Sequence, residues 1–179
     1  QSGASTIYMY NAEGAGPTMD RVMPRLRDMT MALFKIYLVF TAVTTIIFML
    51  CGVEFSIAVT HAMSTIGTCG FSTYDDSTMH FHNLPFELWT ALFMFLAGGS
   101  FSLYYRAWVT GPSVILRNTE FRTYLGIILA AILLIALNLI LEKGIDSTDA
   151  ARFAVFQVTS LSTTGFVSAD FEMWAALSE

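Results

Sequence analysis

STIGTCGFST, residues 64–73, and TSLSTTGFVS, residues 159–168, are the two stretches that decide the fold of this chain. Placing Ser64 on Thr159 aligns a threonine, a glycine and a phenylalanine in both. Each stretch follows an apolar run of about a dozen residues, roughly 18 Å of helix, which crosses only about half of a bilayer core. The pattern therefore predicts two re-entrant loops, in each of which a half-helix enters the membrane and a polar segment returns.

The composition is typical of a membrane protein. Hydrophobic residues make up 55% of the 179 residues and charged residues only 13%, about half of the roughly 25% that is usual in soluble domains. So few charges cannot cover a water-soluble globule of this size. The net charge of -5 argues against a nucleic-acid partner, and two cysteines are too few for a disulfide framework.

Three uncharged runs are long and apolar enough to span a bilayer, which takes about 20 residues. They occupy residues 36–53, 88–105 and 123–141. Two further uncharged runs, residues 55–74 and 153–169, begin apolar and end in Ser, Thr and Gly. Irregular backbone of this kind is tolerated at membrane depth only beside protein or a water-filled cavity. We therefore expect both loops to line a wet path through the bilayer.

Charged residues are sorted between the two sides of the predicted spans. Most acidic residues fall on the side toward which both loops open. Simple solvation of outer loops explains this acidity, and so does a field that concentrates cations at a pore mouth. Basic residues mark the opposite side as cytoplasmic. Seven of the nine lie there: Arg21, Arg25, Arg27, Lys35, Arg106, Arg117 and Arg122.

The alignment of the two loops extends into an internal repeat. Glu54 falls on Asp149, and the first span falls on the third, so that each unit reads span, half-helix, polar loop, span. We expect a cytoplasmic lead-in at residues 1–28, a complete pore repeat at 29–106, a cytoplasmic loop at 107–122 and a second repeat at 123–179. Because the second repeat lacks its final span and the chain begins without methionine, we expect a fragment of a longer protein.

The loops have residues suited to a cation filter. An acid at the start of each half-helix complements the positive end of the helix dipole, so the C-terminal carbonyls point into the membrane and favour cations. Gly70 and Gly165 follow closely, and glycine permits backbone angles that are closed to other residues. Successive carbonyls can then face one axis. Rings of such carbonyls replace the water shell of a potassium ion.

Taken together, these residues resemble the Trk/Ktr/HKT superfamily of potassium transporters, and within it the TrkH/TrkG type. The resemblance rests on GPTMDRVMPRLRDMTMALFKIYL (16–38), STIGTCGFST (64–73), FLAGGSFSLYYR (95–106) and STTGF (162–166), and it extends from Glu13 onward. It implies an all-α membrane protein with four repeated span, half-helix, filter-loop and span units around a central ion pore. This chain would hold the second repeat and most of the third.

The resemblance also implies function, partners and site. It implies potassium uptake through a filter of backbone carbonyls, with K⁺ as the transported ion, no covalently bound cofactor and no enzymatic activity. It implies a homodimer embedded in the lipid bilayer of a bacterial inner membrane, contacted by a cytoplasmic nucleotide-binding regulatory subunit of the TrkA/KtrA kind. The filter residues carried over are Gly67, Thr68, Cys69, Gly70, Ser162, Thr163, Thr164 and Gly165.

The residues also bear on three other possible functions. A two-pore-domain potassium channel would have a glycine after the aromatic residue of its filter, and TIGTCGF and STTGF both lack it. An intramembrane enzyme would need paired acids, a serine with a base, or a metal-ligand set at membrane depth, and none is visible in the sequence. A non-transporting membrane assembly subunit, in which the loops only pack, stays open.

For a few single residues, the sequence allows both a structural and a functional interpretation. His61 aligns with a phenylalanine of the second half-helix, which favours packing or a local hydrogen bond over ion binding. His80 and His82 have a spacing found in metal sites, but no third ligand is evident beyond Asp75 and Asp76 in the same loop. Gly98 and Ser102 stand four apart and fit a close contact between the second span and a half-helix, or a gating hinge.

Overall fold

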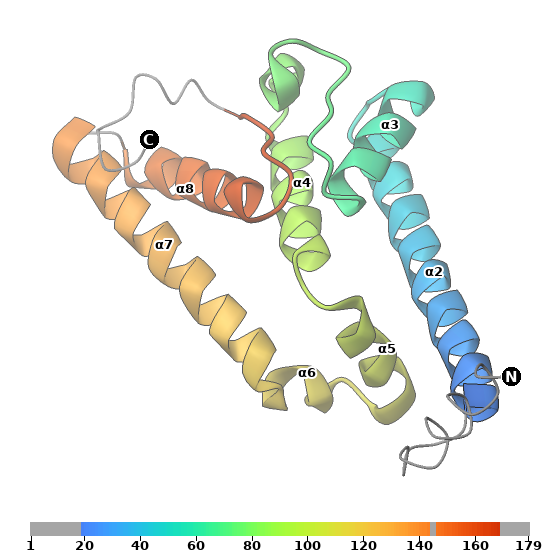
Figure 1. The fold of residues 1–179 in the computed structure, drawn as a ribbon. Helices are drawn as coiled ribbons and strands as arrows, with labels where there is room; N and C mark the ends of the chain where they lie inside the picture. Colours follow the sequence, from blue (N-terminus) through green and yellow to red (C-terminus); the bar gives the residue numbers. More distant parts are fainter. Residues whose placement is uncertain (1–18, 144–145, 169–179) are drawn as a thin grey trace, which may run out of the picture. The chain divides into compact units, whose positions relative to one another are not determined.

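The computed structural model describes residues 19–143 and 146–168. The chain divides into two compact units, Gln1–Lys35 and Ile36–Glu179. Every regular element in the described ranges is a helix (Figure 1). In chain order these are α2 (Met19–Leu50), α3 (Phe55–Ile66), the 3₁₀ helix η1 (Ser77–Phe81), α4 (Leu84–Ala97), α5 (Phe101–Thr110), α6 (Ser113–Arg117), α7 (Thr119–Lys143) and α8 (Ser147–Ser162).

Two of these helices are long and apolar enough to cross a membrane without a break. Arg27–Leu50 in α2 has a mean hydropathy of 2.1, and Thr119–Leu141 in α7 has one of 2.7. Their large apolar side chains are widely exposed, as at Leu134, which is 68% exposed. Lipid tails accept such a surface because they are as apolar as leucine. The membrane-length helices predicted at 36–53 and 123–141 are confirmed.

The C-terminal end of α2 is set by a glycine. Gly52 has a φ of 90°, and its N–H donates to the Met49 carbonyl at 2.9 Å, while the Val53 N–H donates to the Phe48 carbonyl at 3.2 Å. This pair of bonds is a Schellman motif, in which glycine tolerates the left-handed conformation best. Val53 also packs against the core cluster that contains Phe48. The chain thus leaves α2 and enters α3 after a tight turn.

The segment predicted to span at 88–105 is a bent pair of helices rather than one continuous helix. α4 ends at Ala97, α5 begins at Phe101, and the two axes differ by 86°. The break falls on Gly98, Gly99 and Ser100, where two successive glycines disfavour helix by about 1 kcal/mol each relative to alanine. A count of apolar residues does not register such a break, because apolar content remains high on both sides of it.

Tyrosine hydroxyls bind two carbonyls in the last turn of α4, and one of these, the Leu96 carbonyl, also accepts from the Gly99 N–H at 3.2 Å. The Tyr104 hydroxyl donates to the Leu96 carbonyl at 2.7 Å. The Tyr124 hydroxyl, from α7, donates to the Phe95 carbonyl at 3.1 Å. Unsatisfied carbonyls at membrane depth cost several kcal/mol, so these two bonds allow α4 to end inside an apolar region.

Removing one of these hydroxyls should destabilise the break. Tyr104→Phe is expected to lower the free energy of unfolding by about 1 kcal/mol, the typical loss for one hydrogen bond. Thermal unfolding of the purified full-length protein measures the change. Tyr105→Phe, at the 40% exposed neighbour on the same helix, is the matched control and should unfold as the wild type does. Equal losses in the two variants would contradict the assignment.

The break also brings α4 against the second loop. A Cβ on Gly98 would overlap the Tyr124 hydroxyl and lie 2.8 Å from Thr163 Cγ2. The close contact predicted at Gly98 therefore exists, with a residue of α7 and a loop residue as its partners. Ser102 lies on α5, beyond the break, where its hydroxyl pairs with that of Ser100 at 2.7 Å. The predicted shared face of Gly98 and Ser102 is thus wrong.

α3 and α8 lie where the two half-helices are predicted. They have 12 and 16 residues, or about 18 and 24 Å, which is less than the roughly 30 Å of a bilayer core. Glu54 stands at the N-cap of α3. The N-cap of α8 is Asp146, whose carboxylate accepts from the Thr148 N–H at 3.3 Å. Asp149, predicted to open this helix, lies in its first turn instead.

α4 is the element against which both half-helices pack. The residues shared with α3 form one buried cluster, and those shared with α8 form a second. The first cluster contains Phe48, Ala58, Ala62, Ile66, Phe86, Phe93 and Ala97. The second contains Ala91, Met94, Phe156 and Phe166. Figure 1 shows α4 between α3 and α8. One face of α4 therefore packs against the first half-helix, and another packs against the second half-helix and its loop.

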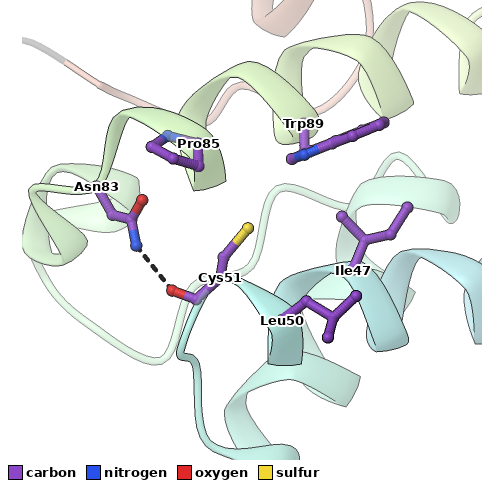
Figure 2. A pocket seen from close by; sticks show the side chains of 6 residues that line it. All are labelled: Ile47, Leu50, Cys51, Asn83, Pro85 and Trp89. Carbon is purple, nitrogen blue, oxygen red and sulfur yellow. Dashed lines mark hydrogen bonds between the residues drawn. The ribbon is translucent and has the colours of Figure 1, made fainter.

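A mostly apolar cavity of about 360 Å³ lies between the end of α2 and the start of α4 (Figure 2). At its edge, the Asn83 side-chain amide donates to the Cys51 carbonyl at 2.8 Å. A second cavity of about 320 Å³ borders the break and the start of α7. The cavity between α2 and α4 is lined by Ile47, Leu50, Cys51, Asn83, Pro85 and Trp89.

Candidate ion-filter loops

The first loop reverses the chain directly after α3. Gly67 caps the helix with φ and ψ of -76° and -3°. Thr68 then takes a φ of 54° and Gly70 one of 75°. Between them, the Cys69 N–H donates back to the Ser64 carbonyl at 2.9 Å. Two left-handed residues so close together explain how the backbone turns away from the helix axis, and threonine pays for this conformation with strain that glycine avoids.

In the second loop, two backbone N–H groups donate to the same carbonyl, which lies near the end of α8. The N–H groups of Thr163 and Gly165 both donate to the Ser160 carbonyl, at 3.0 and 2.8 Å. The Ser160 hydroxyl in turn donates to the Phe166 carbonyl at 2.6 Å. Gly165 has a φ of 80°. This loop is therefore closed on both sides by the backbone and side chain of a single buried serine.

The glycines aligned between the two loops have similar backbone angles. Gly70 and Gly165, aligned from sequence alone, have φ values of 75° and 80°. A residue with a Cβ is destabilised by roughly 1–2 kcal/mol in this left-handed region. The threonines two residues earlier differ, because Thr68 has a φ of 54° and Thr163 one of -139°. The two loops thus share their glycine turn and differ in the approach to it.

Most predicted filter carbonyls accept no hydrogen bond from the described part of the chain. Gly67 is the exception, because its carbonyl lies 3.3 Å from the Cys69 thiol, which donates to it. Unpaired carbonyls at a helix C-terminus carry partial negative charge, which a cation can satisfy. The residues with such carbonyls are Thr68, Cys69, Gly70, Ser162, Thr163, Thr164 and Gly165.

The structure brings the two predicted filter loops into contact. A Cβ built on Gly70 would overlap the backbone oxygen of Thr164, whereas one on Gly165 would meet nothing within 4 Å. The Gly70 backbone therefore lies directly against a carbonyl of the other loop. Only glycine fits here, both for its φ and for the close approach. The eight predicted filter residues thus belong to two adjoining turns.

The phenylalanines that follow the two glycines have opposite environments. Phe71 is 76% exposed, whereas Phe166 is 1% exposed. Phe166 packs in the cluster with Phe156 and Met94. The alignment of the loops predicts equivalent positions but not this difference, because burial depends on what lies beside each loop.

His61 connects the two loops from the buried side. Its Nδ1 lies 3.0 Å from the Ile57 carbonyl, and its Nε2 lies 3.2 Å from the Ser72 hydroxyl in the first loop. Its ring stacks on Phe166 of the second loop, with centroids 5.9 Å apart. The predicted packing and local hydrogen bonding are confirmed. The contact of His61 with both loops could not be predicted from its alignment with Phe156.

The His80–His82 segment forms an aromatic turn. His80 stacks on Tyr74 with centroids 3.6 Å apart, and His82 ends η1 in a left-handed conformation with a φ of 43°. In the described ranges no three histidine, cysteine or acidic side chains form a group that could hold a metal.

Half-helices that end in adjoining, glycine-centred turns with unengaged carbonyls define a pore-loop membrane protein. The chain belongs to the TrkH family, described as cation transport protein, whose profile matches residues 4–178. This is a family of transporters and not of enzymes, and its bacterial members are multi-pass membrane proteins.

Individual relatives agree with this assignment. The chain is 34% identical over 178 residues to the Trk system potassium uptake protein TrkH of Vibrio parahaemolyticus serotype O3:K6, and 31% identical over 175 residues to TrkH of Halomonas elongata. Each alignment covers 96% of this chain but 37% and 36% of the relatives. The chain thus spans little more than a third of the length of these proteins.

A solved structure confirms the fold. The crystal structure of the potassium transporter TrkH from Vibrio parahaemolyticus matches with a TM-score of 0.80 and 31% sequence identity. The match covers 85% of this chain and 34% of the other. The predicted all-α membrane fold is therefore confirmed.

Proposed function

We propose that this chain supplies two walls of the selectivity filter in a potassium-uptake protein of the Trk type. One observation carries the proposal: the turns at Gly70 and Gly165 sit at the ends of two half-helices, and the first touches the second at Thr164. Filter carbonyls must converge from separate chain segments to surround an ion. The chain would correspond to the second repeat and most of the third, with repeats at residues 29–106 and 123–179.

The proposed mechanism uses backbone oxygens. A potassium ion would shed part of its water shell at the outer mouth and pass between carbonyls of residues 67–70 and 162–165, moving down its electrochemical gradient. The negative C-terminal ends of α3 and α8 would lower the cost of this dehydration. Outer acids such as Asp75 and Asp76, both exposed, would raise the local cation concentration before entry.

The proposal extends to location and partners. The protein would lie in a bacterial inner membrane as a homodimer, with the lead-in at 1–28 and the loop at 107–122 on the cytoplasmic side. A nucleotide-binding regulatory subunit of the TrkA/KtrA kind would contact that side. Names of relatives that include "Trk system" support a multi-subunit assembly. Cross-linking and co-purification of the full-length protein from its own membrane would test both contacts.

Uptake of radioactive Rb⁺ tests the function. The full-length gene containing this segment is expressed in a cell that lacks its own potassium uptake, and growth at low K⁺ is followed in parallel. We expect saturable Rb⁺ uptake that excess K⁺ suppresses and equal Na⁺ does not. Absence of uptake while the protein is present in the membrane would contradict the proposal and support a non-transporting assembly subunit.

Family membership favours this function over a two-pore-domain channel. Both loops lack a glycine after the aromatic residue, since Ser72 and Val167 occupy those positions. Val167 has both backbone polar groups engaged by the first repeat, so this position is fixed by neighbours rather than by its own flexibility. A second test is the Rb⁺ to Na⁺ preference of the variants considered in the Discussion.

A further inference from the structure

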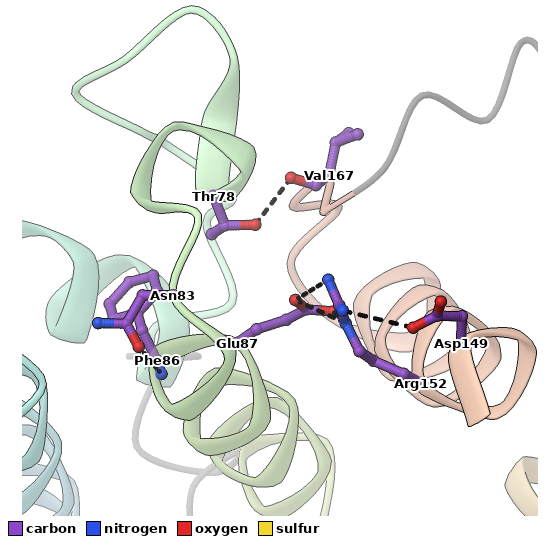
Figure 3. Close-up of polar contacts among 7 residues, drawn as sticks. All are labelled: Thr78, Asn83, Phe86, Glu87, Asp149, Arg152 and Val167. Carbon is purple, nitrogen blue, oxygen red and sulfur yellow. Dashed lines mark hydrogen bonds and ion pairs between the residues drawn. The ribbon is translucent and has the colours of Figure 1, made fainter.

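Polar contacts join the second filter loop and its half-helix to residues of the first predicted repeat, and two of them are drawn in Figure 3. The first joins Glu87, in the first turn of α4, to Arg152, near the start of α8. Arg152 Nε lies 3.2 Å from both carboxylate oxygens of Glu87, and Nη2 lies 3.1 Å from Oε2. These residues are far apart in sequence, so the pair fixes one repeat on the other.

The environment of this pair makes it stronger than a surface ion pair. Glu87 is only 8% exposed, and its position in the first turn of α4 places its charge near the positive end of the helix dipole. Charge-assisted, two-pronged contacts of arginine with a carboxylate are directional as well as strong. Arg152 also lies 3.6 Å from Asp149, but that carboxylate is more than half exposed, where ion pairs contribute little.

The second contact holds the exit of the loop. The Thr78 hydroxyl donates to the Val167 carbonyl at 2.7 Å, and the Val167 N–H donates to the Ser77 hydroxyl at 3.1 Å. Both hydroxyls belong to η1, the 3₁₀ helix of the first repeat. Val167 comes two residues after Gly165. Both backbone polar groups at the exit of the second loop are thus bound by the first repeat.

A third contact lies between these two anchors. The Thr164 hydroxyl lies 2.7 Å from Met94 Sδ on α4. The second loop is therefore attached to the first repeat before, within and after its filter residues. Its own half-helix also holds the loop, through the hydrogen bonds of the Ser160 carbonyl and hydroxyl.

We propose that Glu87, Arg152, Ser77 and Thr78 are positioning residues for ion selection, through which the first repeat sets the geometry of the second repeat's filter loop. This inference rests on the proposed function, because it concerns which cation the filter passes. Filter carbonyls select by their number and placement. A loop that loses its anchor shifts its carbonyls, and selectivity falls before the fold is lost.

The ion pair is tested in the full-length protein by Glu87→Gln, Arg152→Gln, the double variant and Arg152→Lys. Initial rates of Rb⁺ and Na⁺ uptake are measured over a range of concentrations, together with the amount of protein in the membrane. We expect each glutamine variant to lose about tenfold in Rb⁺ over Na⁺ preference. The double variant should be no worse than the poorer single variant, since both remove the same contact. Arg152→Lys should recover part of the preference.

Asp149→Asn is the matched control for the ion pair. It removes a carboxylate from the same arginine, but an exposed one, so selectivity should stay within about twofold of wild type. Thr78→Val and Thr73→Val form a second matched pair, since Thr73 is an exposed threonine of the same outer loop. Thr78→Val should lower the preference severalfold, and Thr73→Val should not. These variants decide the question if a Glu87 variant does not reach the membrane.

The outcomes separate this inference from the proposed function. If the wild-type protein takes up no Rb⁺, the proposed function fails and the inference falls with it. If wild type is selective and the Glu87, Arg152 and Thr78 variants keep its preference at normal abundance, the inference alone is overturned. Equal losses in Asp149→Asn and Arg152→Gln would also overturn it, because the exposed and buried contacts would then not differ.

Discussion

Replacing Gly70 by serine is expected to lower the Rb⁺ over Na⁺ preference of the full-length protein by at least about tenfold, which corresponds to about 1.4 kcal/mol. Two effects add at this position. The φ of 75° strains any residue with a Cβ by roughly 1–2 kcal/mol, and the added Cβ would overlap the Thr164 backbone oxygen. One of the two must move, and either movement displaces a filter carbonyl.

Two other glycines separate these effects. Gly165→Ser introduces similar strain, at a φ of 80°, with nothing within 4 Å of the new Cβ, so its loss of preference should be smaller. Gly52→Ser introduces strain at a φ of 90° in the turn after α2. It should lower thermal stability and leave the ratio of Rb⁺ to Na⁺ uptake unchanged. Wild-type preference in Gly70→Ser would contradict the placement of the filter at this turn.

Truncating Phe166 is expected to have the largest effect on stability. Phe166→Ala should lower the free energy of unfolding by on the order of 3 kcal/mol, because it opens a cavity in a packed cluster. The side chain is 1% exposed, packs with Phe156 and Met94, and stacks on His61. Thermal unfolding of the purified full-length protein gives the measurement.

Leu134→Ala is the control for this truncation. Leu134 is 68% exposed on α7, and a lipid tail can replace its contacts, so its unfolding temperature should change little. Phe166→Leu keeps much of the buried volume and should lose less than Phe166→Ala. If Phe166→Ala were as stable as Leu134→Ala, the cluster on α4 would not hold the second loop.

The sequence allowed two continuous long spans, the two half-helices and the glycine turns to be predicted. Long spans follow from apolar length, which a bilayer requires directly. The turns follow from the pairing of Gly70 with Gly165, because a left-handed backbone angle requires a particular residue type. Each of these features depends on local sequence, and each is found in the structure.

Other features depend on neighbours and could not be predicted in this way. At the break after Ala97, the hydroxyls of Tyr104 and Tyr124 bind carbonyls of α4, and the second hydroxyl comes from a separate helix, α7. Likewise, Glu87 and Arg152 come from α4 and α8, far apart in the sequence. Their pairing is specified by how the half-helix lies on α4, which periodicity and composition do not encode.

The sharing of α4 between two buried clusters limits how members of this family can be recombined. A chimera that exchanged only residues 123–168 for those of a relative would keep the host's Met94, Glu87 and Thr78 beneath a foreign loop. The natural unit of exchange is instead η1 and α4 together with α8 and the loop after it. Junctions placed before Ser77 should therefore keep the polar contacts of the second loop together better than junctions at the predicted boundary between repeats, provided that the exchanged α4 keeps the residues that pack on Phe48 and α3.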